Sequence, residues 1–390
     1  MKIALALENF NSFGGGVEAY AVGLAKKLVE KGWDVHLYGH SWNNEPPKAM
    51  FHRISPLPRF FPPSLRILWF ALNHSRMVRA CNYDVVLGFG NTLFMNVYQS
   101  HGGVHRFSTM RKISAIRNPI LRSAKRALAL ISPKYHVRAW IEGAAFRAEK
   151  RPVVIAISDM VRKDLSAYFG LSEDEIILVY NGADHSKIKA VEEPRISEIR
   201  LKLGFTDEVI FLFMAYDLRK KGALYLLEAV AELARRSSQR PFGVVIVGGA
   251  PSRAMQSLVK RSGLTKQIIF LGPTKEPQLY FRACDVLVLP TFYDACSLVV
   301  FEALAAGMPI ITTKFNGAAG VVREGVTGII LASPSDTHAL SVAMEKFLDP
   351  DFLTRARQEA RDDSISYQLD DNYRKMIHIF DDVAQKKIFT

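Results

Sequence analysis

The most informative segment of the sequence is PTFYDACSLVVFEALAAGMP, residues 290–309. It is flanked by two short apolar runs, Val286–Leu289 and Pro309–Thr312, each of which is typical of a buried strand. Inside it, Ser297 is suited to cap a helix that ends at Gly307. The pattern therefore predicts a strand, a helix and a second strand, which is the repeating unit of a parallel sheet.

The same alternation extends along the whole chain and begins twice, so we predict an α/β protein with two doubly wound, Rossmann-like domains. The polar stretch Asp184–Arg195 marks the boundary. This gives domains at 1–190 and 191–365, and a carboxyl-terminal helix at 366–390 that we expect to pack back on the first domain. The predicted elements are strands at 2–7, 34–38, 84–88, 94–99, 153–156, 176–179, 209–215, 242–247, 268–270, 286–289 and 309–312, and helices at 17–31 and 223–236.

Composition excludes several classes of protein. With 49% hydrophobic and 23% charged residues, the chain is neither disordered nor collagen-like. Its three cysteines form no C-x-x-C pair, which argues against a disulfide framework or a zinc ribbon and fits a reducing cytosol. No apolar run is long enough for an export signal or a membrane span, so we expect neither.

The net charge of +13 is concentrated in one region. Residues 46–151 carry 18 Lys and Arg but only three acids, so the rest of the chain is slightly acidic. Such a basic half suggests an anionic partner, which composition alone leaves open as nucleic acid, an acidic substrate or a membrane surface. The segment Phe51–Arg79 adds aromatic residues to arginines, which suits either a loop and helix over the core or a surface for lipid head groups.

Two segments have the features of phosphate-binding turns. Phe13-Gly14-Gly15-Gly16-Val17-Glu18 lies between a predicted strand and a helix, where glycines let a phosphate approach the free amides, or simply make a tight turn. It is not G-x-G-x-x-G, and Leu37–His40 contains no acid for a ribose, so a nicotinamide enzyme is disfavoured. Asp217-Leu218-Arg219-Lys220-Lys221-Gly222 follows another strand, and its cations could neutralise a diphosphate or form a solvated turn.

Glu302 is the least expected residue of the 290–309 segment, because it interrupts an apolar helix. Burial of its carboxylate would be costly without hydrogen-bond donors such as sugar hydroxyls, although a backbone or Lys partner is an alternative. Seven residues separate it from Asp294. Glu302 therefore points to a ligand with hydroxyl groups.

Together these motifs resemble the retaining glycosyltransferases of family 4, also called group 1, which have the GT-B fold. The D-x7-E pattern from Asp294 to Glu302 is similar to the family's E-x7-E signature, and the glycine-rich turn, the basic turn, Tyr180–Asp184 and Gly325–Gly328 follow in the family's order. The resemblance implies that the two domains face each other across a cleft, the first binding the acceptor and the second the nucleotide sugar. His101–His105 and the basic first half are most similar to the glucosyltransferases of the lipopolysaccharide core.

The resemblance also implies roles for single residues. Glu302 falls at the glutamate that holds the ribose, Asp294 at the residue that faces the donor sugar, and His101 at the histidine beside that sugar. Asp294 is shorter than the family's glutamate, and Gly320 stands where many members have a glutamate. The implied catalytic residues are Asp294, His101, Arg219 and Lys221, and the implied donor-binding residues are Gly15, Gly16, Arg219, Lys220, Lys221, Asp294, Ala295, Ser297, Leu298, Val299 and Glu302.

The function expected from the resemblance is transfer of a hexose, glucose in the first instance, from a nucleotide sugar such as UDP-glucose to a lipopolysaccharide core or related glycan. No metal is expected, since cations serve in its place, and the i, i+4 pair His101 and His105 lacks a third zinc ligand.

We expect a cytoplasmic protein bound peripherally to the inner membrane. Its lipid-binding residues would include Arg111, Lys112, Arg122, Lys125 and Arg126, helped by Phe107 and the segment 60–69. The alternatives are a nucleotide-sugar epimerase, a non-catalytic basic binding protein and a nucleic-acid-binding protein, the last without a recognisable motif.

Overall fold

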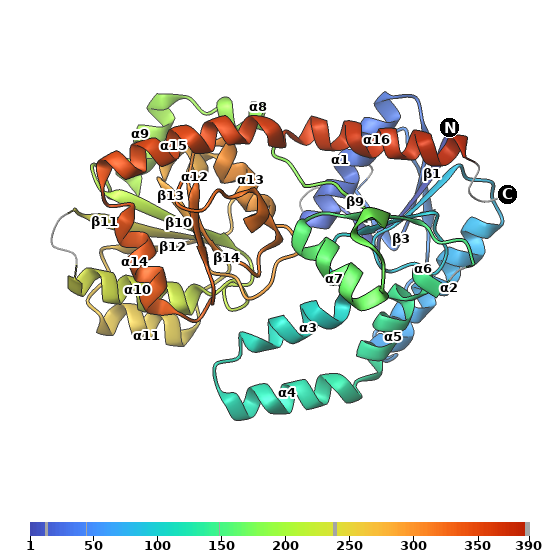
Figure 1. Cartoon of the computed structure of the whole chain (residues 1–390), viewed down its shortest axis with the longest axis horizontal. Helices are drawn as coiled ribbons and strands as arrows, with labels where there is room; N and C mark the ends of the chain where they lie inside the picture. The colour runs from blue at the N-terminus through green and yellow to red at the C-terminus, as the bar shows by residue number, and fades with distance from the viewer. Residues whose placement is uncertain (12–14, 44, 148, 237–239, 387–390) are drawn as a thin grey trace. The chain divides into compact units, whose positions relative to one another are not determined.

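The computed structural model describes residues 1–390 except 12–14, 44, 148, 237–239 and 387–390. The chain forms two compact units (Figure 1). The first unit contains Met1–Tyr180 together with Asp371–Thr390, and the second contains Asn181–Asp370.

The first unit is built on a parallel sheet with the strand order β5-β3-β1-β6-β7-β8-β9. The order reverses between β1 and β6, both of which are buried, so this is a doubly wound sheet with its switch point there. The strands are β1 (Lys2–Ala6), β3 (Asp34–Gly39), β5 (Met50–Arg53), β6 (Val85–Gly88), β7 (Val97–Ser100), β8 (Val153–Ala156) and β9 (Ile176–Leu178), with a short parallel pair β2 (Asn9–Phe10) and β4 (Ser41–Trp42) beside them.

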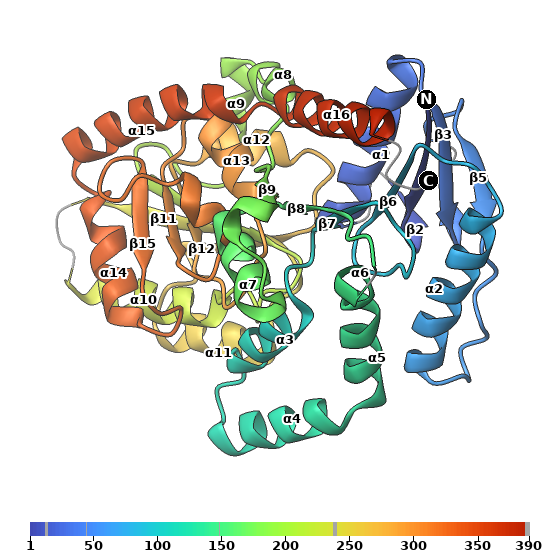
Figure 2. The same cartoon turned by 45° about the vertical axis from the view of Figure 1, so that its right-hand side comes forward.

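The last helix of the chain belongs to the first unit. α16 (Leu369–Gln385) lies beside α1 (Gly16–Glu30), and both views agree on this arrangement (Figures 1 and 2). Asn372 on α16 accepts a hydrogen bond from the buried Tyr20 hydroxyl at 2.9 Å and donates one to the Tyr180 carbonyl at 2.7 Å. A buried amide with both groups satisfied fixes the position of α16 on α1.

Between β7 and β8 the chain leaves the sheet for a helical excursion. It consists of α3 (His105–Ser114), α4 (Pro119–Ile131), α5 (Pro133–Glu142) and α6 (Ala144–Arg147). The buried Glu142 carboxylate accepts a hydrogen bond from the His105 backbone amide at 3.0 Å, which ties α5 to the start of α3. Burial raises the pKa of Glu142 to about 7. α5 also packs against α2 (Pro63–Arg79) through Ile67, Ala71 and Ile141.

The second unit repeats the architecture with the strand order β12-β11-β10-β13-β14-β15, again all parallel. α10, α11 and α14 cover one face of this sheet, and α9, α12, α13 and α15 cover the other (Figure 1). The core on the first face contains Phe211, Phe213 and Leu226, all fully buried. The elements are β10 (Val209–Ala215), β11 (Phe242–Gly248), β12 (Ile268–Gly272), β13 (Val286–Leu289), β14 (Ile310–Thr313), β15 (Gly328–Leu331), α8 (His185–Lys189), α9 (Glu193–Lys202), α10 (Ala223–Arg236), α11 (Arg253–Arg261), α12 (Pro277–Ala283), α13 (Leu298–Ala305), α14 (Thr337–Lys346) and α15 (Pro350–Ser364).

The predicted fold class is confirmed, and β8, β10, β13 and α10 have the predicted bounds. One local expectation is only half right. Ser297 is the N-cap residue of α13, but its side chain makes no capping hydrogen bond. The backbone amides at the amino end of α13 therefore have fewer hydrogen-bond acceptors than the sequence suggests.

Candidate functional site

The predicted site residues of the second unit gather at the switch point of its sheet, where β10 and β13 are neighbours. The basic turn follows β10 and the Asp294 loop follows β13. The two are joined by a hydrogen bond from the Phe292 amide to the Lys220 carbonyl at 3.0 Å. A Cβ on Gly222, where φ is +84°, would lie 2.1 Å from the Pro290 carbonyl oxygen, so only glycine permits this contact. Ligands of doubly wound sheets bind at this place.

The three cations of the basic turn have different surroundings. Lys221 forms an ion pair with Asp294, and both side chains are about one-fifth exposed. Lys220 pairs instead with Asp217 at 2.7 Å. Arg219 is exposed and has no ion-pair partner in the part of the chain that the structure describes. Within the described residues, Lys220 is thus paired with Asp217 of its own turn and Lys221 with Asp294 of the neighbouring loop, while Arg219 has no ion-pair partner.

The amino end of α13 offers backbone donors. In the described residues, the amides of Leu298 and Val299 have no hydrogen-bond acceptor, and the Ser297 side chain supplies none. The first amides of a helix and its dipole together favour an anion. Ala295 and Ser297 are buried below this end, whereas Leu298 and Val299 are partly exposed.

Glu302 lies on the same helix, one turn beyond Leu298 and hence on the same face. Its carboxylate accepts no hydrogen bond from any described residue. Burial raises its pKa to about 7, and the charge of Lys187 only partly opposes this effect. The structural alternative, a backbone or Lys hydrogen bond to Glu302, is therefore not found among these residues. The carboxylate is an unsatisfied acceptor that a ligand hydroxyl can satisfy.

Two buried amides that the sequence analysis assigned no role support the Asp294 loop. The Asn316 side chain, 1% exposed, accepts hydrogen bonds from the backbone amides of Ser297 at 3.3 Å and Ala318 at 3.1 Å. Asn181 donates to the Cys296 carbonyl at 3.2 Å. The signal for Asn316 was present as an Asn-Gly pair shortly after a predicted strand, which marks a turn.

His101, Gly15 and Gly16 lie in the first unit. The His101 ring packs 4.5 Å from the Tyr20 ring, and its Nε2 is buried with no hydrogen-bond partner among the described residues. Burial lowers the pKa of His101 to about 3, so the ring is neutral near pH 7. Gly15 is the N-cap of α1 and Gly16 its first residue, and both are exposed. Phe13 and Gly14 lie outside the described residues.

The placement of His101 and His105 does not support a zinc site. His105 is the first residue of α3, and His101 lies in the turn before that helix. They therefore do not share a helical face as i, i+4 ligands would. The site residues implied by the family resemblance thus form two sets, one in each unit.

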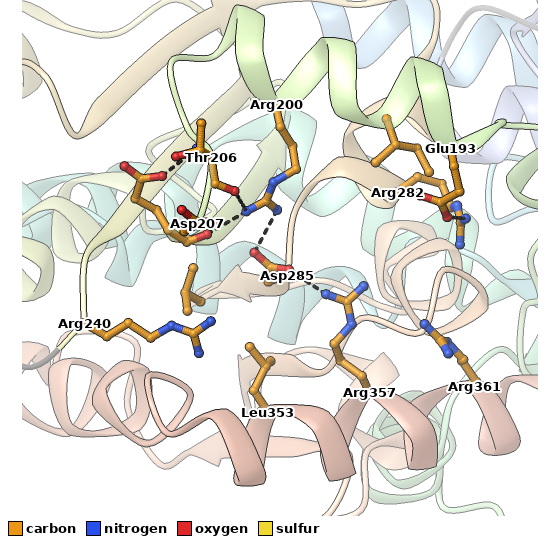
Figure 3. A pocket seen from close by; sticks show the side chains of 13 residues that line it. Glu193, Arg200, Thr206, Asp207, Arg240, Arg282, Asp285, Leu353, Arg357 and Arg361 are labelled. Atoms are coloured by element: carbon orange, nitrogen blue, oxygen red, sulfur yellow. Dashed lines mark hydrogen bonds and ion pairs between the residues drawn. The ribbon is translucent and has the colours of Figure 1, made fainter.

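A cavity of about 410 Å³ in the second unit contains none of the predicted site residues. It lies at the amino-terminal edge of the sheet, where Asp285 precedes β13. Figure 3 shows Arg200 from α9 and Arg357 from α15 directed at Asp285, with N–O distances of 3.2 and 2.5 Å. Because Asp285 also accepts the Ile210 amide at 2.8 Å, this cluster holds two helices to the sheet. We interpret it as structural.

Comparison with known proteins agrees with this geometry. The model of glycosyltransferase family 4 matches residues 14–187, and the model of glycosyl transferases group 1 matches residues 195–363. The lipopolysaccharide glucosyltransferase WaaG of Escherichia coli is 22% identical over 363 residues, which is 92% of each chain. The α-D-kanosaminyltransferase of Streptomyces kanamyceticus is 28% identical, but the match covers only 57% of this chain and 58% of that protein.

Solved structures show the same fold. The crystal structure of WaaG has a TM-score of 0.79 at 20% identity, covering 97% of this chain and 99% of the other. Anabaena HepE in complex with UDP has a TM-score of 0.72 at 17% identity, covering 98% and 100%.

Proposed function

Because this chain belongs to the glycosyltransferases of GT-B type, with a family 4 part followed by a group 1 part, we propose that it is a retaining hexosyltransferase. The donor is a UDP-hexose, with UDP-glucose the first candidate. The acceptor is a lipopolysaccharide core intermediate or a related glycolipid. The name of WaaG, a lipopolysaccharide glucosyltransferase, and the complexes of HepE with UDP and UDP-glucose support these choices.

One observation carries the proposal for the donor: α13 presents an unsatisfied acceptor and unsatisfied donors on one face. Its free amino-terminal amides suit a diphosphate, and the Glu302 carboxylate one turn further suits the two ribose hydroxyls. A nucleotide sugar contains these groups as neighbours. Arg219 and Lys221 at the adjacent turn add the positive charge that a diphosphate requires.

The proposed reaction needs no protein nucleophile. Arg219 and Lys221 stabilise the negative charge that develops on the departing diphosphate, and this phosphate accepts the proton of the attacking acceptor hydroxyl on the same face of the sugar. The bond from the anomeric carbon to the phosphate oxygen breaks as the bond to the acceptor oxygen forms. The neutral His101 ring offers a hydrogen bond to a sugar hydroxyl without adding charge.

The direct test is a panel of nucleotide sugars and nucleoside diphosphates, each added to the full chain while its melting temperature is recorded. Binding to the native state alone raises the melting temperature, so the true donor should give the largest rise. NMR of the product then reports the anomeric configuration. A protein that converts UDP-glucose into another free UDP-hexose without any acceptor would be an epimerase, and an inverted product would contradict the retaining mechanism.

Asp294 should matter for turnover more than for nucleotide binding. If its carboxylate contacts the donor sugar, Asp294→Asn should lower the rate of sugar transfer strongly but leave the affinity for UDP nearly unchanged, because UDP has no sugar to contact. Calorimetry with UDP and a transfer assay measure the two quantities separately. An equal loss of both would assign Asp294 to the nucleotide instead, through its ion pair with Lys221.

We also propose that the protein binds the anionic surface of the inner membrane from the cytoplasm, through α4. This helix has no buried residue, and Ile120 and Ile131 are 80% and 74% exposed. Figure 2 shows α4 between α3 and α5, away from the sheet of its unit. The two isoleucines share one face with Leu121, Ala124 and Leu128, by their spacing.

The basic face of α4 is turned the other way. Arg126 donates a hydrogen bond to Ser114 Oγ on α3 at 3.1 Å, and Arg122 on the same face is partly buried. A helix with its apolar side in solvent is the reverse of an ordinary surface helix and requires a covering partner. Lys125 is exposed next to the apolar face, and a basic residue in that place is typical of helices that lie in the interface of an anionic bilayer.

Two of the predicted lipid-binding residues make contacts within the protein instead. Arg111 is held by Asp164 through hydrogen bonds of 2.8 and 3.1 Å, and Phe107 packs against Tyr168. The membrane proposal therefore rests on α4 and not on them. No helix in the described part of the chain is long and apolar enough to span a bilayer.

Removing the apolar face of α4 should weaken binding to vesicles. Burial of one Ile side chain is worth about 1.5–3 kcal/mol, so Ile120→Gln/Ile131→Gln should reduce partitioning into phosphatidylglycerol vesicles by about tenfold or more. The matched control is Leu201→Gln/Ile365→Gln, since these side chains are 66% and 63% exposed on the other unit. Co-sedimentation with anionic and neutral vesicles measures the effect. Unchanged binding of the α4 variant, or a wild-type protein that binds neither vesicle, would refute the proposal.

A further inference from the structure

A second cavity, of about 230 Å³, lies in the first unit. Glu8 follows β1 and His40 follows β3, and both line it, so the cavity is at the carboxyl-terminal edge of the sheet where doubly wound folds bind ligands. The His40 backbone amide donates to the Glu8 carbonyl at 2.7 Å, and His40 Nδ1 donates to the Ile54 carbonyl at 2.7 Å. These bonds hold the floor of the cavity to the strand ends.

The walls of this cavity carry an excess of positive charge. Arg66 from α2 and Lys134 and Arg138 from α5 line it, and Glu8 is the one carboxylate among its lining residues. Within the part of the chain that the structure describes, none of these three cations has an ion-pair partner. By contrast, the acids Asp285 and Glu193 pair with arginines in the cavity of the second unit. The charge of the first-unit cavity is therefore not balanced by the protein.

The two arginines are also unsatisfied as hydrogen-bond donors. The Nε atoms of Arg66 and Arg138 are buried and have no acceptor among the described residues. A buried donor without a partner costs free energy, and a charged one costs more. An acceptor supplied from outside the chain would remove this cost.

Two further features make the same region positive. The cavity meets the first turns of α2, at Pro63, and of α5, at Lys134, where the helix dipoles point their positive ends. The positive charges of this region also act on His105. Its pKa is lowered to about 4, first by burial and then by the charges of Arg138, Lys112 and Lys134.

We propose that this cavity binds a phosphate group, with Arg66 and Arg138 donating to its oxygens and Lys134 contributing charge. The cavity is smaller than the roughly 300–1,000 Å³ of sites for drug-sized ligands, so it takes one anionic group and not a whole saccharide. The phosphate belongs either to a phosphorylated sugar of the acceptor or to a phospholipid head group. The link between cavity and acceptor rests on the proposed function, whereas the anion site itself does not.

The test compares the full chain with Arg66→Gln/Arg138→Gln. The probes are glucose 6-phosphate and glucose, read by melting temperature, and vesicles with or without phosphatidylglycerol, read by co-sedimentation. Saturating UDP is present throughout, so that the phosphosugar cannot act by filling a nucleotide site. The matched control, Lys48→Gln/Arg76→Gln, removes two exposed cations of the same unit that do not line the cavity.

In the wild type and the control, glucose 6-phosphate should raise the melting temperature and glucose should not. In Arg66→Gln/Arg138→Gln the concentration needed for the same rise should increase by tenfold or more, because two charge-assisted hydrogen bonds are lost. This result assigns the phosphate to a sugar. If the phosphosugar has no effect but the variant loses vesicle binding and the control does not, the phosphate is that of a lipid head group.

If neither probe distinguishes the variant from the control, the proposal is wrong. Lys134→Gln, at an exposed position, provides the same comparison should the double variant not fold. The outcome is independent of the transferase assignment: a chain that binds no nucleotide sugar but shows the arginine-dependent phosphate effect would refute the proposed function and keep the anion site.

Discussion

Lys221→Met should lower the rate of sugar transfer by about 10²–10³-fold, the usual cost of removing one group that stabilises developing charge. Lys221 lies in the basic turn after β10, paired with Asp294, at the switch point of the second sheet. In the proposed reaction its ammonium is most valuable when the diphosphate departs, because negative charge grows there. The loss should therefore appear mainly in kcat, with a smaller change in the affinity for UDP.

Lys220→Met is the comparison that makes this result informative. The two lysines are neighbours of equal charge, but Lys220 pairs with Asp217 of the same turn at 2.7 Å, whereas Lys221 pairs with Asp294, the residue proposed to face the donor sugar. Replacement of Lys220 should cost much less than that of Lys221. Transfer of glucose from UDP-glucose to water, without any glycan acceptor, provides an assay that does not depend on the acceptor's identity. Equal losses in the two variants would show that the turn acts only as a diffuse positive patch.

Glu302→Ala should weaken the binding of the nucleotide sugar by roughly ten- to a hundredfold. A hydrogen bond to a charged group is worth about 1.5–3 kcal/mol, and the Glu302 carboxylate has no described protein donor that could take over. Calorimetry with UDP and with UDP-glucose should show similar losses, because both ligands contain the ribose. The fold should survive, since the side chain removed is partly exposed and accepts no hydrogen bond from a described residue. Unchanged affinity for both ligands would remove Glu302 from the donor site.

The binding of UDP-glucose should also depend on pH through Glu302. Its pKa of about 7 in the free protein means that the carboxylate is increasingly protonated below pH 7 and then accepts hydrogen bonds less well. Affinity should rise between pH 6 and 8 and then level off, and Glu302→Gln should abolish this rise. The diphosphate of UDP-glucose does not titrate in that range.

The stability of the folded state should depend on pH in the opposite direction to the affinity for UDP-glucose. The folded state holds this proton more tightly than the unfolded chain, so the contribution of Glu302 to stability is full at acidic pH and is lost as the pH rises through 7. Melting curves of the wild type and of Glu302→Gln without ligand should therefore diverge between about pH 4.5 and 7 and keep a constant difference above pH 7.

Local pattern was enough to predict the longer strands of this chain, but it gave ranges for only a few of its helices. The strands β8, β10 and β13 and the helix α10 are short apolar or amphipathic runs bounded by Gly, Pro or polar residues, and these signals are contained in neighbouring residues. The basic turn and the Asp294 loop could be predicted to meet because both follow strands of one parallel sheet. The absence of a capping hydrogen bond from the Ser297 side chain could not be predicted, because a side-chain rotamer depends on the packing around it.

The sequence by itself determined the two doubly wound sheets, the family, and the candidate donor residues Arg219, Lys221, Asp294 and Glu302, because each is written in periodicity or in a short motif. Only the tertiary structure decided which charges are left unbalanced. Arg111 is paired with Asp164, whereas none of the three cations that line the first-unit cavity has an ion-pair partner among the described residues. The physical reason is that a charge's partner is set by distance in space, and Arg111 and Asp164 are 53 residues apart in the chain.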